Sequence, residues 1–234
     1  MIPRKIHYIW FGGVKPNSLN TAIRTWKKHA SNYSIIEWNE KNLPYFNNSF
    51  YREALKKKNY AFASDYARLK ILEKYGGVYI DTDMYLLDEI DPVLKNRELV
   101  FGILNEDYIF STSLIASIPN QNFIKRALEV YNGLSYEQGH KIPNTVLLSP
   151  LMFNMYNFEK KDITQEREDN RVIAYNSNIL LQPSFSSIAM HVGEKSWGAH
   201  TKHDDIRIKM RQNITTSTEA GIFRIINDMC RRFI

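Results

Sequence analysis

The chain has 234 residues, of which 44% are hydrophobic and 24% are charged, as is typical of one globular domain with its own core. No apolar run approaches the ~20 residues that a membrane helix requires, and the first residues lack the apolar segment of a secretory signal. The single cysteine, Cys230, excludes a disulfide framework and a cysteine zinc site. We therefore expect a cytoplasmic protein.

The net charge of +6 attracts phosphorylated ligands, anionic lipids and nucleic acids alike. No helix-turn-helix, zinc-finger or RNA-binding pattern accompanies this charge. We therefore rank nucleic-acid binding well below the binding of phosphorylated ligands or anionic lipids.

The first third of the chain alternates strands and helices. The hydrophobic pattern predicts a strand, a helix, a second strand and, after a loop, a short basic helix, over residues 5–11, 16–30, 33–38 and up to Lys58. Gly12 and Gly13 follow the first strand and leave room for a nucleotide to approach the backbone.

A helix–turn–strand unit over Tyr60–Met84 is the most informative stretch. Its first half has apolar residues at helical spacing, and Gly76-Gly77 is expected to end that helix. Residues 78–80 form a short apolar strand, and Asp81-Thr82-Asp83 follows at its carboxyl end, where open α/β sheets bind ligands. Asp65 and Arg68 share one face of the preceding helix. The unit therefore brings three carboxylates and one guanidinium to one neighbourhood.

The remaining elements are predicted as follows. Residues 85–90 are extended and lead into a turn at Asp91-Pro92; strands are expected over 99–104, 108–118, 171–175 and 179–181, and a helix over 120–133. We expect irregular chain around a short helix over 135–150, forming an acceptor-side wall, and an exposed loop over 158–170.

Thr216 and Glu219 fit a capping box that opens a C-terminal amphipathic helix. Two positions suit this helix: docked on the core through its apolar face, or lying on an anionic membrane surface. Docking is favoured, and contact with the inner membrane is the alternative.

Paired carboxylates after a strand suit a hard divalent cation, Mn²⁺ or Mg²⁺. Mg²⁺ typically shares its remaining positions with substrate phosphates, so few protein carboxylates suggest a metal–diphosphate ligand. Alone, Asp-x-Asp is a weak signal, and the strand and helix before it strengthen the prediction.

Three separated segments carry a resemblance to a known family. Ser64-Asp65-Tyr66-Ala67-Arg68, Tyr75-Gly76-Gly77-Val78-Tyr79 and Asp81-Thr82-Asp83 resemble the signature of DXD-containing glycosyltransferases. The opening Ile2 to Gly13 is similar to that family's first strand, and His191-Val192-Gly193-Glu194-Lys195-Ser196-Trp197 resembles its His-His-x-x-x-Ser-Trp element, with Val192 in place of the second histidine. The group is that of bacterial capsular-polysaccharide sugar transferases, which includes the yeast initiating α-1,6-mannosyltransferase. Clostridial glucosylating toxins are more distant relatives.

This resemblance implies a single-domain α/β fold of the GT-A type, a Rossmann-like mixed sheet flanked by helices. Within one domain over 1–234, residues 1–90 would bind the nucleotide sugar, 91–215 would form the acceptor side and the closing segment, and 216–234 the C-terminal helix. The implied reaction is retaining transfer of a hexose to a glycan or lipid-linked acceptor in capsule or surface polysaccharide synthesis. UDP-hexose is favoured over GDP-mannose as donor.

The resemblance also implies residue roles. Asp83 and His191 would hold the cation, with Asp81 sharing it or binding the ribose; His200 and His203 are reserve ligands. Asp65 and Arg68 would bind sugar hydroxyls, Trp10 would stack on the base, and Ser196 and Trp197 would face the diphosphate and close over the donor. The remaining residues expected to line the donor site are Ile9, Ser64 and Thr82.

Two other classes of protein stay open. A metal-dependent nucleotidyl- or phosphotransferase could use the same carboxylates, but the chain lacks a G-x-x-x-x-G-K-[ST] phosphate loop. A basic nucleic-acid-binding module is the less favoured alternative. Release of free nucleoside diphosphate without pyrophosphate distinguishes the sugar transferase from the first class.

Overall fold

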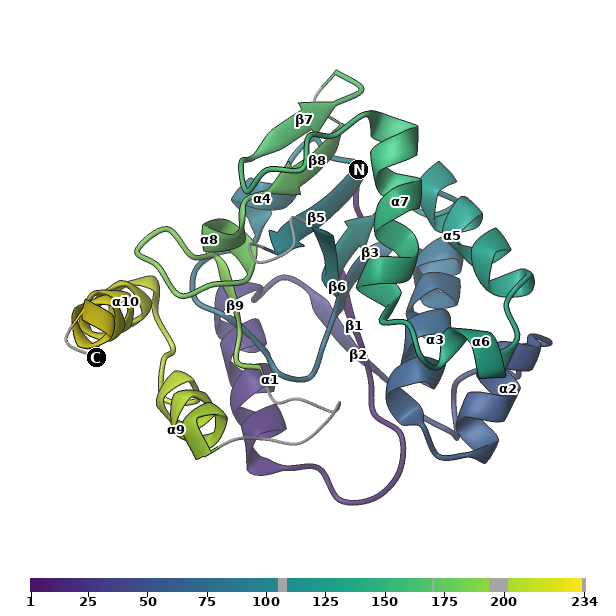
Figure 1. Ribbon diagram of the computed structural model, residues 1–234, viewed down its shortest axis with the longest axis horizontal. Helices are drawn as coiled ribbons and strands as arrows, with labels where there is room; N and C mark the ends of the chain where they lie inside the picture. Colours follow the sequence, from purple (N-terminus) through teal and green to yellow (C-terminus); the bar gives the residue numbers. More distant parts are fainter. Residues whose placement is uncertain (105–108, 170, 194–201, 233–234) are drawn as a thin grey trace.

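A mixed β-sheet forms the centre of the protein in the computed structural model, which describes residues 1–104, 109–169, 171–193 and 202–232 (Figure 1). Seven described strands lie in the order β2-β1-β3-β6-β5-β8-β7. Their bounds are Ser34–Trp38, Lys5–Ile9, Gly77–Ile80, Ile109–Ser117, Leu99–Leu104, Val172–Tyr175 and Gln165–Arg167. β1 pairs in parallel with β2 and β3, β5 pairs in parallel with β8, and the remaining pairs are antiparallel. The predicted mixed α/β class is confirmed.

Helices cover both faces of this sheet. Their bounds are α1 Asn17–His29, α2 Ser49–Lys56, α3 Tyr60–Tyr75, α4 Asp91–Leu94, α5 Asn122–Asn132, α6 Tyr136–Gly139, α7 Asn144–Tyr156, α8 Ser177–Leu180, α9 Lys202–Arg211 and α10 Ser217–Arg232. A small antiparallel pair, β4 (Met84–Leu86) and β9 (Ala189–His191), lies beside α1.

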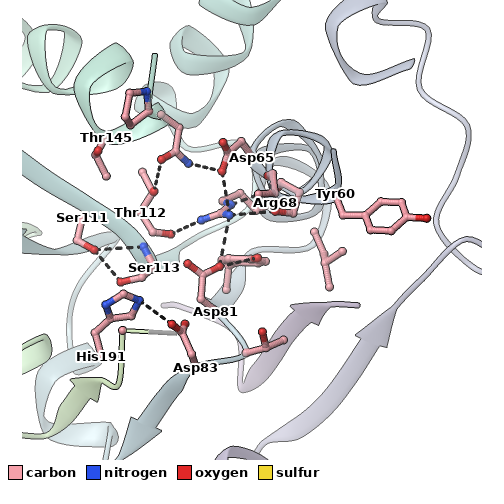
Figure 2. A pocket seen from close by; sticks show the side chains of 18 of the residues that line it. Tyr60, Asp65, Arg68, Asp81, Asp83, Ser111, Thr112, Ser113, Thr145 and His191 are labelled. Carbon is pink, nitrogen blue, oxygen red and sulfur yellow. Dashed lines mark hydrogen bonds and ion pairs between the residues drawn. The ribbon is translucent and has the colours of Figure 1, made fainter. Parts of the chain in front are cut away.

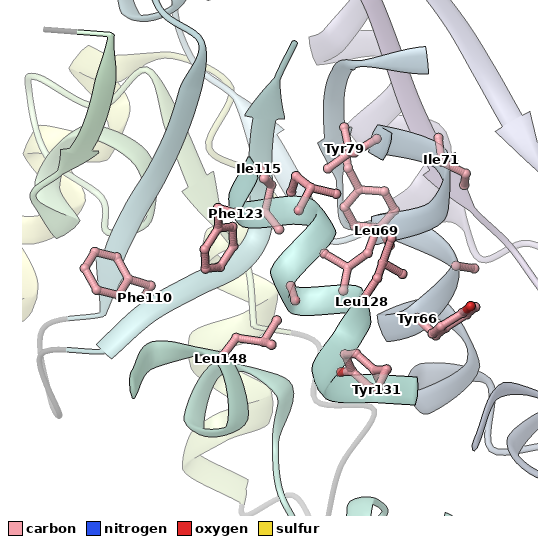
Figure 3. Close-up of a cluster of buried hydrophobic side chains, with 14 of the residues drawn as sticks. Tyr66, Leu69, Ile71, Tyr79, Phe110, Ile115, Phe123, Leu128, Tyr131 and Leu148 are labelled. Carbon is pink, nitrogen blue, oxygen red and sulfur yellow. The ribbon is translucent and has the colours of Figure 1, made fainter. Parts of the chain in front are cut away.

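Two hydrophobic cores fill the spaces between the sheet and its helices, because successive strand residues point to opposite faces. On β3, Tyr79 joins the core beneath α2, α3, α5 and α7, whereas Val78 and Ile80 join the core beneath α1 and the β4–β9 pair. Figure 3 shows the first core, in which Phe123 and Leu128 of α5 lie near Leu69 of α3. The sheet is therefore packed on both sides.

The turn between α3 and β3 depends on two glycines. Gly76 has φ of 58°, and a Cβ there would lie 2.7 Å from the ring of Pro119. Gly77 has φ of 95°, and a Cβ there would lie 2.6 Å from the Lys5 carbonyl oxygen. Any other side chain would be strained in this conformation and would collide with neighbouring backbone. The predicted helix stop at Gly76-Gly77 is confirmed, and it lets a long helix continue directly into a central strand.

Four predicted elements differ from the structure. Asp91-Pro92 opens the short helix α4 and does not form a turn, as proline is tolerated in a first helical turn. The region 135–150 holds α6 and the start of α7, which contains Pro150 in its interior. Pro150 has no N–H to donate to the carbonyl of Val146, one turn earlier. The loss is tolerated because both residues are exposed to solvent. The expected loop at 158–170 includes β7, which pairs with β8.

The fourth difference is at 179–181, where a strand was predicted and α8 is found. The side chain of Asn176 accepts a hydrogen bond from the Asn178 N–H, and Asp162 accepts from both the N–H and the hydroxyl of Ser177, each at 2.6 Å. These bonds satisfy the first N–H groups of a helix. A three-residue apolar run cannot by itself distinguish a strand from a helix.

The C-terminal helix α10 begins with the predicted capping box. Thr216 N–H donates to Glu219 at 3.1 Å, and Glu219 N–H donates to the Thr216 hydroxyl at 3.2 Å. The expected docking of its apolar face on the core is wrong, because the side chains on that face are about half exposed: Ile222, Ile225, Ile226 and Met229. Within the described part of the chain, no helix is long and apolar enough to cross a bilayer.

Candidate active site

A pocket of about 600 Å³ opens at the carboxyl ends of β1 and β3 (Figure 2). Its walls come from the loop after β1, the first turns of α3, the Asp81–Asp83 turn, β6, the start of α7 and the end of β9. The lining residues are Ile9, Trp10, Phe11, Pro16, Tyr60, Ala61, Ser64, Asp65, Arg68, Tyr79, Asp81, Thr82, Asp83, Leu104, Ser111, Thr112, Ser113, Pro143, Asn144, Thr145, His191 and Gly193.

Arg68 stands at the centre of the polar wall, and it is only 5% exposed. Its Nη2 lies 2.9 Å from Asp65 Oδ1 and 3.3 Å from Asp81 Oδ1, while Nη1 donates to the Thr112 carbonyl at 2.8 Å. The guanidinium also lies over the ring of Tyr79, 4.5 Å from its centre. Burial lowers the pKa of Arg68, but the neighbouring Asp81, Tyr79 and Asp65 raise it by a larger amount. The pKa is therefore raised overall, and the guanidinium stays charged.

Asp65 is fixed by a chain of hydrogen bonds from the opposite wall. Asn144 Nδ2 donates to Asp65 Oδ1 at 2.6 Å, and the Thr112 hydroxyl donates to Asn144 Oδ1 at 2.8 Å. The second oxygen, Oδ2, is buried and has no hydrogen-bond partner among the residues that the structure describes. Burial raises the pKa of Asp65 to about 7, although Arg68 opposes the shift. A buried oxygen without a partner, in a residue that lines a pocket, is suited to accept a ligand hydroxyl.

Asp81 lies on the other side of Arg68. The Tyr79 hydroxyl donates to Asp81 Oδ1 at 2.9 Å, and burial raises the pKa of Asp81 while Arg68 lowers it. Asp81 is therefore engaged with Arg68 and Tyr79.

Asp83 and His191 lie next to each other in the wall of the pocket (Figure 2). Asp83 Oδ2 and His191 Nε2 are 3.1 Å apart, and Val192 N–H donates to the Asp83 carbonyl at 2.9 Å. Burial lowers the pKa of His191, but the Asp83 carboxylate raises it more, so the pair favours an imidazolium facing a carboxylate. Their backbones are adjacent because β4 and β9 pair immediately after the Asp-Thr-Asp turn.

The nucleotide-side wall is formed by the loop after β1. Ile9 and Trp10 line the pocket, and the N–H of Gly12 donates to Glu40 at 2.6 Å. A Cβ at Gly12, whose φ is 68°, would lie 2.7 Å from the ring of Tyr60. This glycine allows the loop and the Tyr60 ring to approach closely.

Nine of the predicted site residues lie together in this pocket: Ile9, Trp10, Ser64, Asp65, Arg68, Asp81, Thr82, Asp83 and His191. The predictions for Ser196, Trp197 and His200 fall outside the described residues. The side chain of His203 is likewise not described.

Sequence reasoning gave no role to Tyr60, Tyr79, Asn144 or Thr145, all of which line the pocket. Asn144 had one local signal, since it follows Pro143 at the start of an apolar helical segment. Ser111, Thr112 and Ser113 of β6 also line the pocket.

The pocket offers some, but not all, of the ligands that a divalent cation needs. Among residues 1–104, 109–169, 171–193 and 202–232, no group of three or more His, Cys, Asp or Glu side chains is placed to hold a metal ion. The pair Asp83 and His191 offers one carboxylate oxygen and one imidazole nitrogen to the pocket. Such a pair would fit Mn²⁺ or Mg²⁺ once the imidazolium of His191 gives up its proton, with diphosphate oxygens and water in the remaining positions.

Comparisons with known proteins agree with this geometry. Residues 16–100 match the sequence model of the family described as a glycosyltransferase sugar-binding region containing a DXD motif. The chain is 25% identical over 203 residues to inositol phosphoceramide mannosyltransferase 1 of Schizosaccharomyces pombe, covering 84% of this chain and 62% of that protein. The chain thus spans less than two thirds of the length of this relative.

Among solved structures, the chain is similar to the PaToxG glycosyltransferase, with a TM-score of 0.51 and 18% identity over 66% of this chain and 70% of the other. The fold is that of a glycosyltransferase. The expected GT-A-like architecture is confirmed, and the matched DXD segment contains Asp65, Arg68, Asp81 and Asp83 of the pocket.

Proposed function

We propose that the protein transfers a hexose from a nucleoside diphosphate sugar to a glycan or lipid-linked acceptor, with the help of a divalent cation. One observation carries this proposal. Two charged groups, Asp65–Arg68–Asp81 and Asp83–His191, line one pocket within a glycosyltransferase fold. The first group suits sugar hydroxyls and the second suits a cation and diphosphate.

The chemistry follows from these positions. Breaking the bond between the anomeric carbon and the diphosphate oxygen leaves negative charge on the diphosphate, while the acceptor oxygen forms the new bond to that carbon. Mn²⁺ or Mg²⁺, when bound, neutralises the charge as it develops. Asp83 and His191 would hold the cation, and the acceptor proton would pass to the released diphosphate. We propose retention of the anomeric configuration.

Within this proposal, the other residues position the donor. The unpartnered Oδ2 of Asp65 would accept a sugar hydroxyl, and Arg68 would keep that carboxylate oriented. Trp10 would stack on the base, and Ser196 and Trp197 would close over the donor and exclude water. The nucleotide-binding part, 1–90, and the acceptor part, 91–215, both contribute residues to the pocket. We therefore propose that they act as one domain.

The donor and the biological setting are further proposals. UDP-hexose is the favoured donor, and GDP-mannose is a serious competitor because a curated relative is named a mannosyltransferase. That relative's name also includes a lipid, inositol phosphoceramide, which agrees with a lipid-linked acceptor. We place the enzyme in surface polysaccharide synthesis at the cytoplasmic face of the membrane.

A thermal-shift panel of UDP- and GDP-sugars, with and without Mn²⁺, tests the donor site. A donor at about 100 times its Kd should raise the melting temperature by roughly 5 to 10 °C in the presence of Mn²⁺. Asp83→Asn should lose this Mn²⁺-dependent shift, and the exposed Asp88→Asn should keep it.

The reaction itself is tested by product analysis. With an acceptor present, we expect release of free nucleoside diphosphate and no pyrophosphate. Release of pyrophosphate, or the absence of stabilisation by every nucleoside diphosphate sugar tested, would contradict the proposal.

A further inference from the structure

The C-terminal helix α10 faces outward with its apolar side, opposite to the usual orientation of a surface helix. Ile222, Ile225, Ile226 and Met229 are 49%, 51%, 49% and 55% exposed. In Figure 1, α10 lies at the edge of the molecule, outside the layers that cover the sheet.

The rotation of α10 is set by the residues that meet the body of the protein. Ala220 is fully buried, and a Cβ on Gly221 would lie 2.3 Å from the ring of Phe185. Arg224 Nη1, on the same side, donates to Asn178 Oδ1 at 2.5 Å. The buried Ala220 and the half-buried Phe223, which packs against the core beneath α1, face the body of the protein. Ile222, Ile226 and Met229 lie on the opposite side and are held toward solvent, and Ile225 borders a pocket with Gly221 and Phe185 while remaining half exposed.

The preceding helix α9 extends the exposed apolar surface. Ile206 and Met210 are 60% and 47% exposed and lie one helical turn apart, while Ile208 is buried. Lys209 is exposed beside them. We call the exposed side chains Ile206, Lys209, Met210, Ile222, Ile225, Ile226 and Met229 the C-terminal surface.

The charge of this region indicates what covers it. Residues 202–232 contain seven Lys and Arg against four Asp and Glu, so half of the chain's net charge of +6 lies in these 31 residues. An anionic surface would be attracted by this charge, whereas a second copy of the chain would bring the same positive charges together. Amphipathic helices with apolar and basic side chains bind anionic lipid in this way.

We propose that the C-terminal surface docks on an anionic lipid bilayer, with the isoleucines and methionines entering the headgroup region. α10 has 16 residues and does not cross the bilayer, so the helix lies in the plane of the interface. Binding of this kind is peripheral and reversible.

The surface is joined to the pocket through Arg211 of α9. Its Nη1 donates to the His191 carbonyl at 2.8 Å, and its Nη2 lies 3.0 Å from Gln182 Oε1. A bilayer bound to α9 is therefore connected to the wall that carries His191. Where the proposed transfer activity holds, this arrangement would bring the pocket to an acceptor carried by a lipid.

Co-sedimentation of the full chain with vesicles tests the proposal. We compare vesicles of phosphatidylcholine alone with vesicles that contain about 30% phosphatidylglycerol. Binding should require the anionic lipid and should weaken severalfold between about 0.1 M and about 0.5 M salt.

Two variants separate this surface from other exposed apolar residues. The triple variant Ile222→Ser, Ile225→Ser and Ile226→Ser should bind anionic vesicles roughly tenfold more weakly, because less apolar surface enters the bilayer. The matched control, Tyr45→Ser with Ile163→Ser, changes side chains that are 75% and 47% exposed elsewhere and should bind as the wild type does. Circular dichroism checks that both variants fold.

Three outcomes would overturn the proposal: no binding to anionic vesicles, equal binding by the triple variant, or self-association of the wild type that the triple variant abolishes. The last would assign the surface to a second copy. Vesicle binding needs no donor sugar, and Asp83→Asn should bind vesicles normally. Failure of the lipid proposal is thus distinguishable from failure of the proposed transfer activity.

Discussion

The pocket wall and the C-terminal surface depart from the average burial of their residue types in opposite directions, since the first buries charged side chains and the second exposes apolar ones. At the pocket, Asp65 and Arg68 are 4% and 5% exposed, although charged residues are almost never buried unless paired. At the C-terminal surface, isoleucines are about half exposed on a helix whose small residues face inward. Both regions carry a proposed ligand, and the difference lies in its size: a small polar molecule for the pocket and an extended apolar surface for the helices.

The two regions also differ in what their residues do for stability. A buried guanidinium between two carboxylates is stabilised only while all partners remain, because a lone buried charge is costly. An isoleucine that is half exposed loses little when it is replaced. Substitutions should therefore have large effects on stability at the pocket and small ones at the C-terminal surface.

The largest effect is expected for Arg68→Met. Removing the guanidinium leaves Asp65 and Asp81 buried without their cation, which should lower the free energy of unfolding by about 3 to 5 kcal/mol. Urea unfolding measures the change. The control Arg126→Met breaks an ion pair with Glu129 whose side chains are 58% and 60% exposed, and should cost less than about 1 kcal/mol. Equal losses of unfolding free energy in Arg68→Met and Arg126→Met would show that the buried ion pairs contribute no more to stability than an exposed one.

A pH-dependent effect is expected for Asp65→Asn. The pKa of Asp65 is raised to about 7 in the folded protein, so its stabilising contribution is full below its ordinary value of 3.8 and is lost as the pH rises to 7. Asn does not titrate, so the stability of the variant relative to the wild type should increase by about 2 to 3 kcal/mol between pH 5 and pH 8. Chemical unfolding at both pH values measures this difference. A difference that does not change with pH would contradict the assignment.

A smaller loss is expected for Asn144→Ala, which removes the bond to Asp65 and the acceptor of the Thr112 hydroxyl. The free energy of unfolding should fall by about 1 to 2 kcal/mol. The thermal shift caused by the donor sugar should also fall, because Asp65 loses its orientation. Asn47→Ala, at an exposed residue outside the pocket, serves as the control. Unchanged donor binding in Asn144→Ala would show that Asp65 needs no such support.

The smallest effect is expected for Ile226→Ser at the C-terminal surface. Its side chain is 49% exposed, so the free energy of unfolding should change by less than about 1 kcal/mol. Ile208→Ala, at a residue of α9 that is 7% exposed, should cost about 2 to 4 kcal/mol. A large loss in Ile226→Ser would mean that this side chain supports the fold, and the contrast between the two regions would disappear.

Local patterns were sufficient where one segment determines its own structure. The helix before Gly76-Gly77 and the strand after it were predicted because glycine geometry and apolar periodicity act over a few residues. The Asp65, Arg68, Asp81 and Asp83 cluster followed from that unit, since one turn connects its two halves. Asn144 escaped prediction because only tertiary packing brings its segment to the pocket wall. Tyr60 lies one helical turn before Ser64 on the same helix, and this spacing was a signal that could have found it.

The helix α10 shows what hydrophobic periodicity cannot predict. Periodicity identified the apolar side of the helix, but it could not say which side meets the body of the protein. The packing of Ala220 and Phe223 against parts of the core that are distant in sequence decides that question. Likewise, α8 was mistaken for a strand because its cap depends on Asp162, fifteen residues earlier.

The Asp-Thr-Asp turn is supported by its backbone. Asp81 N–H donates to the Ser113 carbonyl at 2.7 Å, Met84 N–H donates to the Asp81 carbonyl at 3.0 Å, and Val192 N–H donates to the Asp83 carbonyl at 2.9 Å. None of these bonds uses the aspartate side chains. The carboxylate at 83 can therefore be exchanged for other donor groups while the main chain keeps its path, whereas the carboxylate at 81 is also bound by Arg68 and Tyr79. Position 83 is thus a practical starting point for redesigning ion preference.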